Sequence, residues 1–429
     1  MKLKLVVASM GILGFISQAA FADISYKDNY KDKVACIISK NTIIMNDMTQ
    51  NTGRSLPNPC YPGWFNRIHL SGGVNFDTGK WGNRDVGNPA AVGGTGRSYN
   101  GENTRKFTLN DAYLNMSVDI NDWASAFMGI SYIDASPLYS MAYQTAVNSL
   151  FIDNINNRPN VQQAYLRIGN FEESPFYVEL GQEFQDYGRY EIHPITESLP
   201  QVLTETLRTS LKIGFLLPMG INGSASIFQN PLATSINGVS PYNYVGSLGF
   251  SHPNDDFGYQ IGIGYMYNMF GINSIGNMSA YKAGIQFPAA IYHQRVDGIA
   301  LYGDVNFTSF ALNLRYTNSM RDFSPLDFPL AANNLAVGAK PWAASALASY
   351  GFNLFAINQN VYAGYQVSRQ TVFFNLPRDR WQIGYGINLL KHTDLTAEWD
   401  HDLAYSVAQG GPTQGASNLV SLRLAITFG

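Results

Sequence analysis

The sequence predicts an all-β fold, namely a transmembrane antiparallel β-barrel of about 16 strands. Stretches of alternating apolar and polar residues recur along the chain, a pattern typical of strands with one wet face and one apolar face. Their connections alternate between short and long, as in barrels with short periplasmic turns and long external loops. Charged residues make up only 14% of the chain and aromatic residues 13%, which suits strands that face lipid.

Residues 1–22 have the features of a signal peptide. Lys2 and Lys4 form a basic start, residues 5–16 are mostly apolar, and residues 20–22 read AFA, an A-x-A cleavage site. No later apolar run reaches the roughly 18 residues that a spanning helix needs. Export combined with a barrel pattern predicts a multi-pass protein of the outer membrane of a Gram-negative cell.

Residues 23–65 form a short N-terminal extension, either periplasmic or plug-like. They contain Cys36 and Cys60, the only two cysteines of the chain. Because the periplasm is oxidising, this isolated pair predicts one disulfide. Two buried free thiols are the alternative.

Residues 66–429 are expected to form the barrel. The first strand covers about 66–77, and a Gly-rich connection, 78–106, leads to the alternation at 112–120. The final strand places Leu422, Leu424, Ile426 and Phe428 on one face. Short turns are expected at 121–122, 170–174, 218–219, 253–256, 308–309, 353–356 and 391–394. Long connections are expected at 134–158, 186–205, 230–241, 271–293, 319–341, 369–379 and 405–416.

A barrel of 16 to 18 strands leaves a water-filled lumen, and alternation assigns the side chains that face it. Both charge signs occur among these side chains, and charges that face each other across a pore set its ion preference. The alternative is that any wet lumen collects charges because lipid excludes them. The pore-lining candidates are Arg167, Glu179, Glu183, Arg208, Lys212, Asp304, Arg315, Glu398 and Arg423.

No catalytic, metal or cofactor site is expected. The six histidines are scattered without metal-ligand spacing. Residues 93–98 read GGTGRS, which lacks the lysine of a phosphate-binding loop. The formal net charge of −3 gives no basic excess for nucleic acid. An enzyme is therefore not expected.

One region goes beyond general barrel chemistry. Residues 162–170 read QQAYLRIGN, 174–178 read SPFYV, and 187–191 read YGRYE. This region resembles the siderophore porin family (LbtU type). The resemblance implies outer-membrane uptake of an iron–siderophore chelate through a barrel without a large globular plug. The chain departs from that family in its short N-terminal extension and in having Tyr187 where Phe is common.

The loop at 186–205 is the candidate constriction, with Arg189, Tyr190, Glu191 and His193 as the residues that could meet a solute. An external loop in solvent is the alternative. The expected function is an outer-membrane channel, most specifically for an iron–siderophore chelate or a similar small solute. A general or anion-preferring porin and a structural or adhesive surface barrel are the alternatives. Expected partners are outer-membrane lipid, lipopolysaccharide and the solute; the sequence does not assign an oligomeric state.

Overall fold

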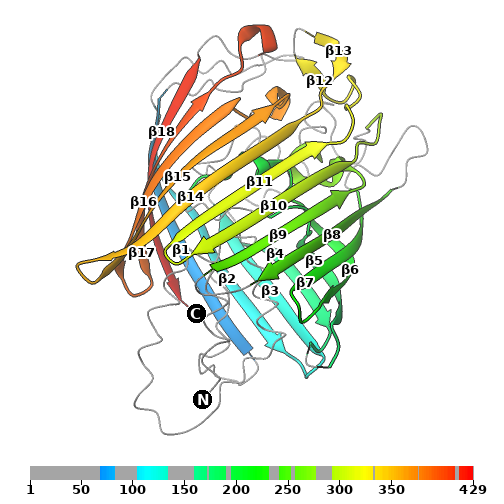
Figure 1. The fold of residues 1–429 in the computed structure, drawn as a ribbon, viewed down its shortest axis with the longest axis vertical. Coiled ribbons are helices and arrows are strands. Elements are labelled where there is room, and N and C mark those ends of the chain that lie inside the picture. The colour runs from blue at the N-terminus through cyan, green and yellow to red at the C-terminus, as the bar shows by residue number, and fades with distance from the viewer. Residues whose placement is uncertain are drawn as a thin grey trace.

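Sixteen antiparallel strands close into a barrel in the computed structural model, as the sequence predicts (Figure 1). The predicted signal peptide, the extension at 23–65 with Cys36 and Cys60, and the loop residues Tyr190, Glu191 and His193 lie outside the described residues. The structure describes residues 68–82, 104–133, 159–171, 173–189, 195–230, 241–252, 257–276, 292–331, 334–374, 376–410 and 415–428.

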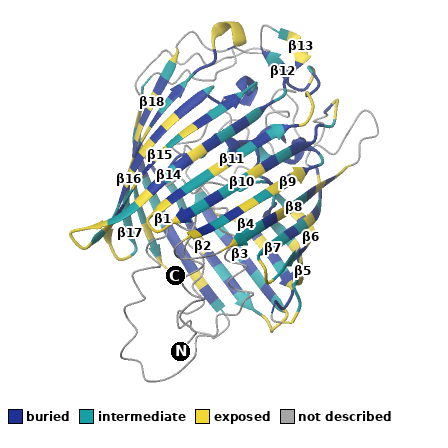
Figure 2. Ribbon diagram, viewed as in Figure 1, coloured by how far each residue is buried: buried dark blue, intermediate teal, exposed yellow. Residues whose placement is uncertain are grey.

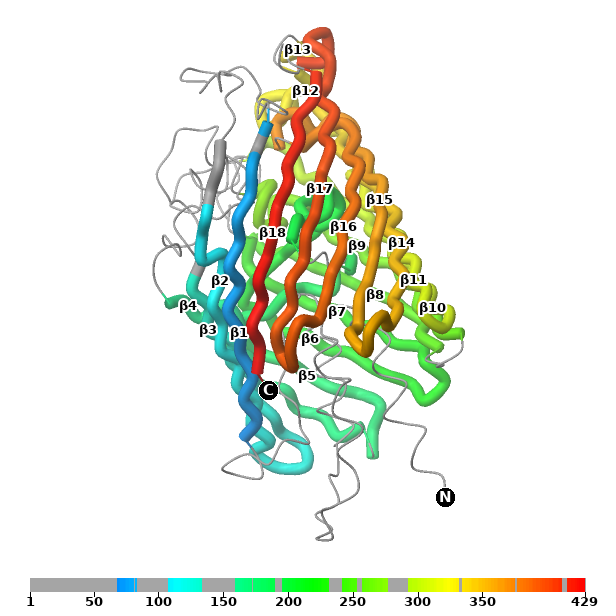
Figure 3. The backbone as a smooth tube through the Cα atoms, turned by 90° about the vertical axis from the view of Figure 1, so that its left-hand side faces the viewer, coloured from blue at the N-terminus to red at the C-terminus, as the bar shows by residue number. Residues whose placement is uncertain are grey.

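Each barrel strand pairs with its neighbours in chain order, and β18 pairs with β1 to close the ring (Figure 3). The barrel strands are β1 (Ile68–Gly82), β2 (Thr104–Asp119), β3 (Ala124–Ile133), β4 (Pro159–Ile168), β5 (Phe176–Phe184), β6 (Leu207–Leu216), β7 (Ile221–Gln229), β8 (Tyr242–His252), β9 (Phe257–Met266), β10 (Gly298–Phe307), β11 (Phe310–Ser319), β14 (Trp342–Leu354), β15 (Ile357–Arg369), β16 (Asp379–Leu390), β17 (Thr393–Leu403) and β18 (Ala416–Phe428).

The remaining described elements belong to the long connections at one end of the barrel. β12 (Pro329–Ala331) and β13 (Asn334–Gly338) form a separate two-stranded hairpin. The helical turns are α4 (Leu199–Val202), η5 (Met269–Gly271), η6 (Val372–Phe374) and η7 (Val407–Gln409). Short turns join the strands at the opposite end, where the start of β1 and the end of β18 also lie (Figure 1).

Both predicted bounds of the connection at 78–106 are wrong. β1 continues to Gly82 and β2 begins at Thr104, with Thr78 paired to Phe107 and Gly79 paired to Lys106. Backbone hydrogen bonds hold such a ladder together whatever the side chains are. Strands that continue beyond the lipid need no apolar face, so the alternation used for prediction ends before the strand does.

Exposed and buried residues alternate along the strands (Figure 2). On β5, Phe176 and Leu180 are 64% and 58% exposed, whereas Tyr177 and Glu179 between them are 5% and 1% exposed. An outer face this apolar has its charged residues turned inward, as expected of a barrel in lipid. Among the described residues, no helix combines the length and apolar character that a membrane crossing requires.

Candidate functional site

The described part of the connection between β5 and β6, residues 185–189 and 195–206, lies inside the barrel. We call it the inward segment. Its helical turn α4 contacts β11, β14 and β15, which lie across the ring from β5 and β6 (Figure 3). The inward segment thus lies in the lumen and contacts the wall on both sides.

Local sequence signals shape the inward segment. Gly188 has φ +90°, a left-handed conformation that favours glycine, and a Cβ there would lie 3.2 Å from Thr204. Ser198 caps α4, its hydroxyl accepting a hydrogen bond from the Gln201 amide at 3.3 Å. Pro200 lies in the first turn of α4, where its missing N–H costs nothing. A tight turn and a capped helical start therefore come from the sequence itself.

Three hydrogen bonds join the inward segment to strands β15, β16 and β17. We call the side of the barrel formed by β15 to β18 the far wall. The Leu199 amide donates to Gln366 Oε1 on β15 at 2.8 Å. Thr196 Oγ1 donates to Asp400 Oδ2 on β17 at 2.8 Å. Arg380 Nη1 on β16 donates to the Glu197 carbonyl at 3.0 Å. These bonds run from three neighbouring strands to one short stretch, so they fix its position across the lumen.

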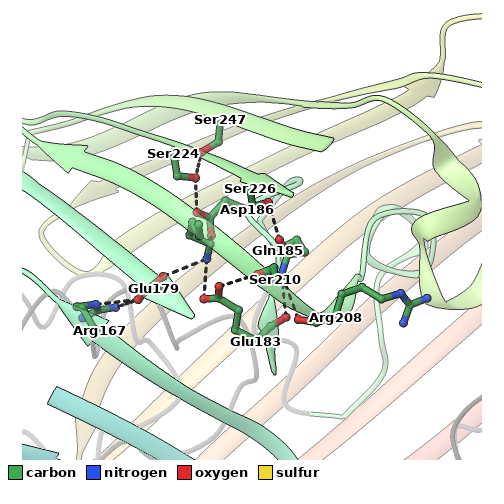
Figure 4. A network of polar contacts seen from close by, with 11 residues as sticks. Arg167, Glu179, Glu183, Gln185, Asp186, Arg208, Ser210, Ser224, Ser226 and Ser247 are labelled. Carbon is green, nitrogen blue, oxygen red and sulfur yellow. Dashed lines mark hydrogen bonds and ion pairs between the residues drawn. The ribbon is translucent and has the colours of Figure 1, made fainter. Parts of the chain in front are cut away.

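A buried charge cluster lies on the opposite side of the barrel, formed by β4 to β8, which we call the near wall (Figure 4). Lys212 Nζ on β6 lies 2.8 Å from Glu183 Oε2 and 3.3 Å from Glu179 Oε2, both on β5. It also lies 3.3 Å from Asp186 Oδ1 of the inward segment. Arg167 Nε on β4 donates to Glu179 Oε1 at 2.7 Å. Arg167, Glu179 and Lys212 are each at most 2% exposed, so each charge depends on its partners for stabilisation.

Hydroxyl and amide groups extend this cluster along β6, β7 and β8. Ser210 Oγ donates to Glu183 Oε1 at 3.0 Å and accepts from Gln185 Nε2 at 3.0 Å. Ser224 Oγ donates to Asp186 Oδ2 at 2.5 Å and lies 2.9 Å from Ser247 Oγ. The base of the inward segment is therefore hydrogen-bonded directly to β6 and β7, and through Ser224 to β8 (Figure 4).

Acidic side chains predominate on the described far wall. Glu398, Asp400 and Asp402 alternate along β17 and face inward, each no more than 6% exposed. Arg380 binds Asp402 with two parallel bonds, Nε–Oδ1 at 2.6 Å and Nη2–Oδ2 at 2.8 Å. Tyr362 on β15 donates to Glu398 Oε2 at 2.6 Å. Arg380 thus joins Asp402 to the inward segment, whereas hydroxyl groups of Tyr362 and Thr196 bind Glu398 and Asp400.

A second ion pair joins the far wall to the first strand, where the barrel closes. Arg423 on β18 contacts Asp77 on β1 through two bonds of 2.7 Å each. Because β1 and β18 meet at the closure of the ring, this pair supports the seam on its lumenal side.

An apolar core lies at the barrel end that carries the long loops. The Phe270 ring is 4.7 Å from Tyr292 and 5.3 Å from Phe323, centroid to centroid. The Phe328 ring is 5.1 Å from Phe323 and 4.8 Å from Phe374. We call this cluster the mouth core, and it continues into inward-facing strand residues and the inward segment. Its other members include Tyr187, Leu199, Val202, Leu203, Phe228, Val245, Met266, Ala300 and Ala343.

Tyr187 joins the inward segment to the mouth core. It is 0% exposed, and burial raises the pKa of its phenol well above the ordinary value. The ring packs among the apolar side chains of the mouth core.

The pore-lining candidates all lie on the inner face of their strands, but not in one place. Arg167, Glu179, Glu183 and Lys212 meet in the near-wall cluster. Asp304 and Arg315 form a separate pair at 2.7 Å on β10 and β11. Arg208 Nη1 donates to Asn273 Oδ1 at 2.8 Å. Glu398 and Arg423 belong to the far wall.

The constriction candidate Arg189 is the one member of its group among the described residues. Its guanidinium carbon lies 5.7 Å from the centroid of the Tyr302 ring on β10. Arg189 and Tyr302 are both partly exposed, as are Ser224, Ser247 and Asn313 nearby on the inner wall. These groups are therefore within reach of water in the lumen.

Sequence reasoning missed several functional candidates. Asp402 lies four residues after Glu398 on β17 and therefore faces the same side. Arg380 directly precedes the outward-facing Trp381 on β16 and therefore faces inward. The alternation of the sequence could have identified both residues. Asp186 and Thr196 lie in a loop, where no periodicity exists. Only the folded structure brings them to the walls.

Comparison with known proteins gives distant relatives and a shared fold. No family model matches the chain. It is 24% identical over 320 residues to a UPF0422 protein of Coxiella burnetii, covering 72% of this chain and 62% of the relative. It is 24% identical over 329 residues to a UPF0422 protein of Legionella pneumophila, covering 73% of this chain and 58% of the relative. The chain thus spans about three fifths of these curated relatives.

Solved structures of similar shape are outer-membrane barrels. An anion-selective porin from Comamonas acidovorans aligns with a TM-score of 0.50 at 12% identity, over 84% of this chain and 99% of the porin. The outer-membrane channel DcaP of Acinetobacter baumannii aligns with a TM-score of 0.51 at 12% identity, over 84% of this chain and 97% of DcaP. Salmonella typhi OmpF, solved with daunomycin, aligns with a TM-score of 0.52 at 13% identity, over 84% of this chain and 97% of OmpF. These likenesses show the fold, and they agree with the predicted outer-membrane location.

Proposed function

We propose that this protein is an outer-membrane channel for small polar solutes, with the inward segment as its constriction. The observation that carries the proposal is the set of bonds from Thr196, Glu197 and Leu199 to β15, β16 and β17. A loop tied to both walls narrows a lumen at a fixed position. A surface protein whose loops act outside the cell has no use for such ties.

The chemistry of the narrowing suits charged or hydrogen-bonding solutes. One side presents Asp186, Ser224 and Ser247, which are joined by hydrogen bonds. Arg189, placed over Tyr302, adds a cation and an aromatic face. A solute passing there would exchange water for fixed donors and acceptors, which is how pore linings select among solutes.

We propose an iron–siderophore chelate as the most specific solute. Among the residues that resemble siderophore porins, 162–191, the described ones lie in β4, in β5, in the turn between them and in the first part of the inward segment. The resemblance therefore coincides with the near wall of the narrowing, including Arg167, Glu179, Glu183 and Asp186. Of these residues, Arg167, Glu179 and Glu183 are buried, whereas the Asp186 side chain is 21% exposed, so Asp186 is the one that a solute shared with that family would contact.

Liposome swelling with sugars of graded size tests the channel. The full chain should admit small sugars and exclude large ones. A variant with residues 195–204 replaced by a Gly-Ser linker should admit larger sugars, because the ties to the far wall are lost. Lys391→Ala, in a short turn at the other end of the barrel, is the matched control and should keep the original size limit. No swelling with any sugar by either protein would refute a channel.

Growth on chelated iron tests the finer proposal. A deletion strain on iron-limited medium should lose growth on a ferric siderophore and regain it with the intact gene. Equal growth of both strains, together with normal sugar permeation, would contradict siderophore uptake and support a general porin.

A further inference from the structure

Two clusters of the same composition lie at the long-loop end of the barrel, on its outer face. In the first, Asp379 at the start of β16 accepts a hydrogen bond from Arg378 Nε at 2.5 Å and from Arg369 Nη2 at 3.3 Å. Tyr365 on β15 donates its hydroxyl to the same carboxylate at 2.8 Å. The Asp379 side chain is 7% exposed, whereas those of Arg369 and Arg378 are 36% and 38% exposed.

The second cluster has the same residue types and lies beside the start of β10 and the end of β11. Arg321 Nε lies 2.8 Å from Asp297 Oδ1, with the arginine side chain 46% exposed and the aspartate side chain 10% exposed. The Tyr265 side chain on β9 hydrogen-bonds to Asp297 and Arg295. Arg295 itself lies over the Tyr267 ring, 4.0 Å from its centroid. Each cluster therefore consists of one buried aspartate, two arginines and one outward-facing tyrosine.

Both clusters lie directly above an aromatic belt. The Tyr365 ring is 4.6 Å from Trp381, and the Arg369 guanidinium is 5.9 Å from Trp342. Tyr267 contacts Tyr244 on β8 at 5.5 Å. Outward-facing Trp and Tyr mark the level at which lipid acyl chains meet head groups. The arginines are thus at the level of the head groups, at the end where the long external loops lie.

The charge of each cluster favours an anion. Each cluster contains one carboxylate and two guanidinium groups, so each carries a net charge of +1 on a chain whose formal net charge is −3. A guanidinium presents five N–H donors in a planar fork that matches phosphate geometry. Asp379 contacts both arginines of the first cluster, whereas in the second cluster Asp297 contacts Arg321 and the Tyr267 ring lies under Arg295. Each arginine is therefore held in place beforehand, which lowers the entropy lost when a phosphate binds.

We propose that these two clusters bind phosphate groups on the glycolipid of the outer leaflet, lipopolysaccharide. The two clusters are four strand spacings apart, about 19 Å measured perpendicular to the strands, so they can engage one large head group or two neighbouring ones. The aromatic belt below them would contact the acyl chains. This role is separate from the passage of solute, because none of these side chains lines the lumen.

Native mass spectrometry of the full chain in mild detergent tests the proposal, with bisphosphorylated lipid A as the probe. The wild-type protein should retain lipid A. The variant Arg295→Ala/Arg321→Ala/Arg369→Ala/Arg378→Ala should bind it at least about tenfold more weakly, since each cation near an anionic lipid surface contributes to affinity. Lys391→Ala, at the opposite end of the barrel, should bind like the wild type.

Two further measurements separate phosphate recognition from general lipid contact and from misfolding. Dephosphorylated lipid A should bind the wild type as weakly as lipid A binds the fourfold variant; equal binding of both lipids to the wild type would overturn the proposal. Heat-dependent gel mobility and circular dichroism should show a folded barrel. If the fourfold variant does not fold, Arg378→Gln alone should still weaken lipid A binding, and unchanged affinity would overturn the proposal. Displacement of lipid A by an equal concentration of inorganic phosphate would also overturn it.

Discussion

Arg380 binds Asp402 through two parallel bonds and donates a third to the Glu197 carbonyl of the inward segment. One buried guanidinium therefore links two adjacent strands of the wall to the loop that narrows the lumen. The pair on the wall fixes the orientation of the guanidinium plane. That orientation in turn fixes where the loop can attach.

We expect Arg380→Ala to widen and loosen the constriction. The change leaves Asp402 without its cation and the Glu197 carbonyl without its donor, and losing one partner of a buried pair costs about 3–5 kcal/mol. Single-channel recordings in planar bilayers should show higher conductance and more current noise. Arg321→Ala, an exposed arginine at the rim, is the control. Identical conductance for Arg380→Ala and wild type would show that this bond does not set the opening.

We expect Lys212→Met to destabilise the barrel. Glu179, Glu183 and Asp186 would lose the ammonium group they share, and the free energy of unfolding should fall by about 3–5 kcal/mol. Urea unfolding in lipid vesicles, followed by tryptophan fluorescence, measures this loss. Adding Glu183→Gln should recover part of the stability, because one negative charge is then removed. Strictly additive losses in the double variant would contradict a shared cluster.

The fold could be predicted because lipid imposes alternation on every strand that crosses it. Phe176, Val178 and Leu180 face outward as the alternation at 176–180 predicts, and Glu179 faces inward between them. The same parity placed Arg167, Lys212, Arg315 and Arg423 in the lumen. Strand ends beyond the lipid were misjudged, as at Gly82 and Thr104, because no apolar face is required there.

The site could be predicted only in part, because loops carry no periodicity. The sequence left open whether the loop at 186–205 enters the lumen or lies outside in solvent, and it gave no sign that Thr196 reaches Asp400 more than two hundred residues away. Nor could spacing show that Phe270, Phe323, Phe328 and Phe374, from three different loops, share one core. Such contacts depend on closure of the barrel, which brings distant loops to one mouth.

We expect Arg189→Ala to lower the permeability of anions relative to cations. Arg189 is partly exposed in the lumen beside Tyr302, so its charge acts on ions that pass. The reversal potential in a KCl gradient should shift toward cation preference, and more strongly at low salt, where screening is weaker. Lys391→Ala, outside the lumen, should leave it unchanged. An unchanged reversal potential for Arg189→Ala would exclude this residue from the narrow part of the pathway.

We expect Phe328→Ala to loosen the mouth core without opening the barrel wall. Phe328 is 0% exposed and its ring meets Phe270, Phe323 and Phe374. Removing a buried aromatic ring costs about 3–5 kcal/mol, and here the loss should fall on the loops because the strands keep their backbone ladders. Hydrogen exchange should therefore accelerate at 321–331 and 372–374 but not in β14 or β15. Leu326→Ala, 67% exposed in the same loop, is the matched control and should exchange like the wild type. Equal exchange for the two variants would mean that the rings do not hold the loops together, and the mouth would then be flexible in the native protein.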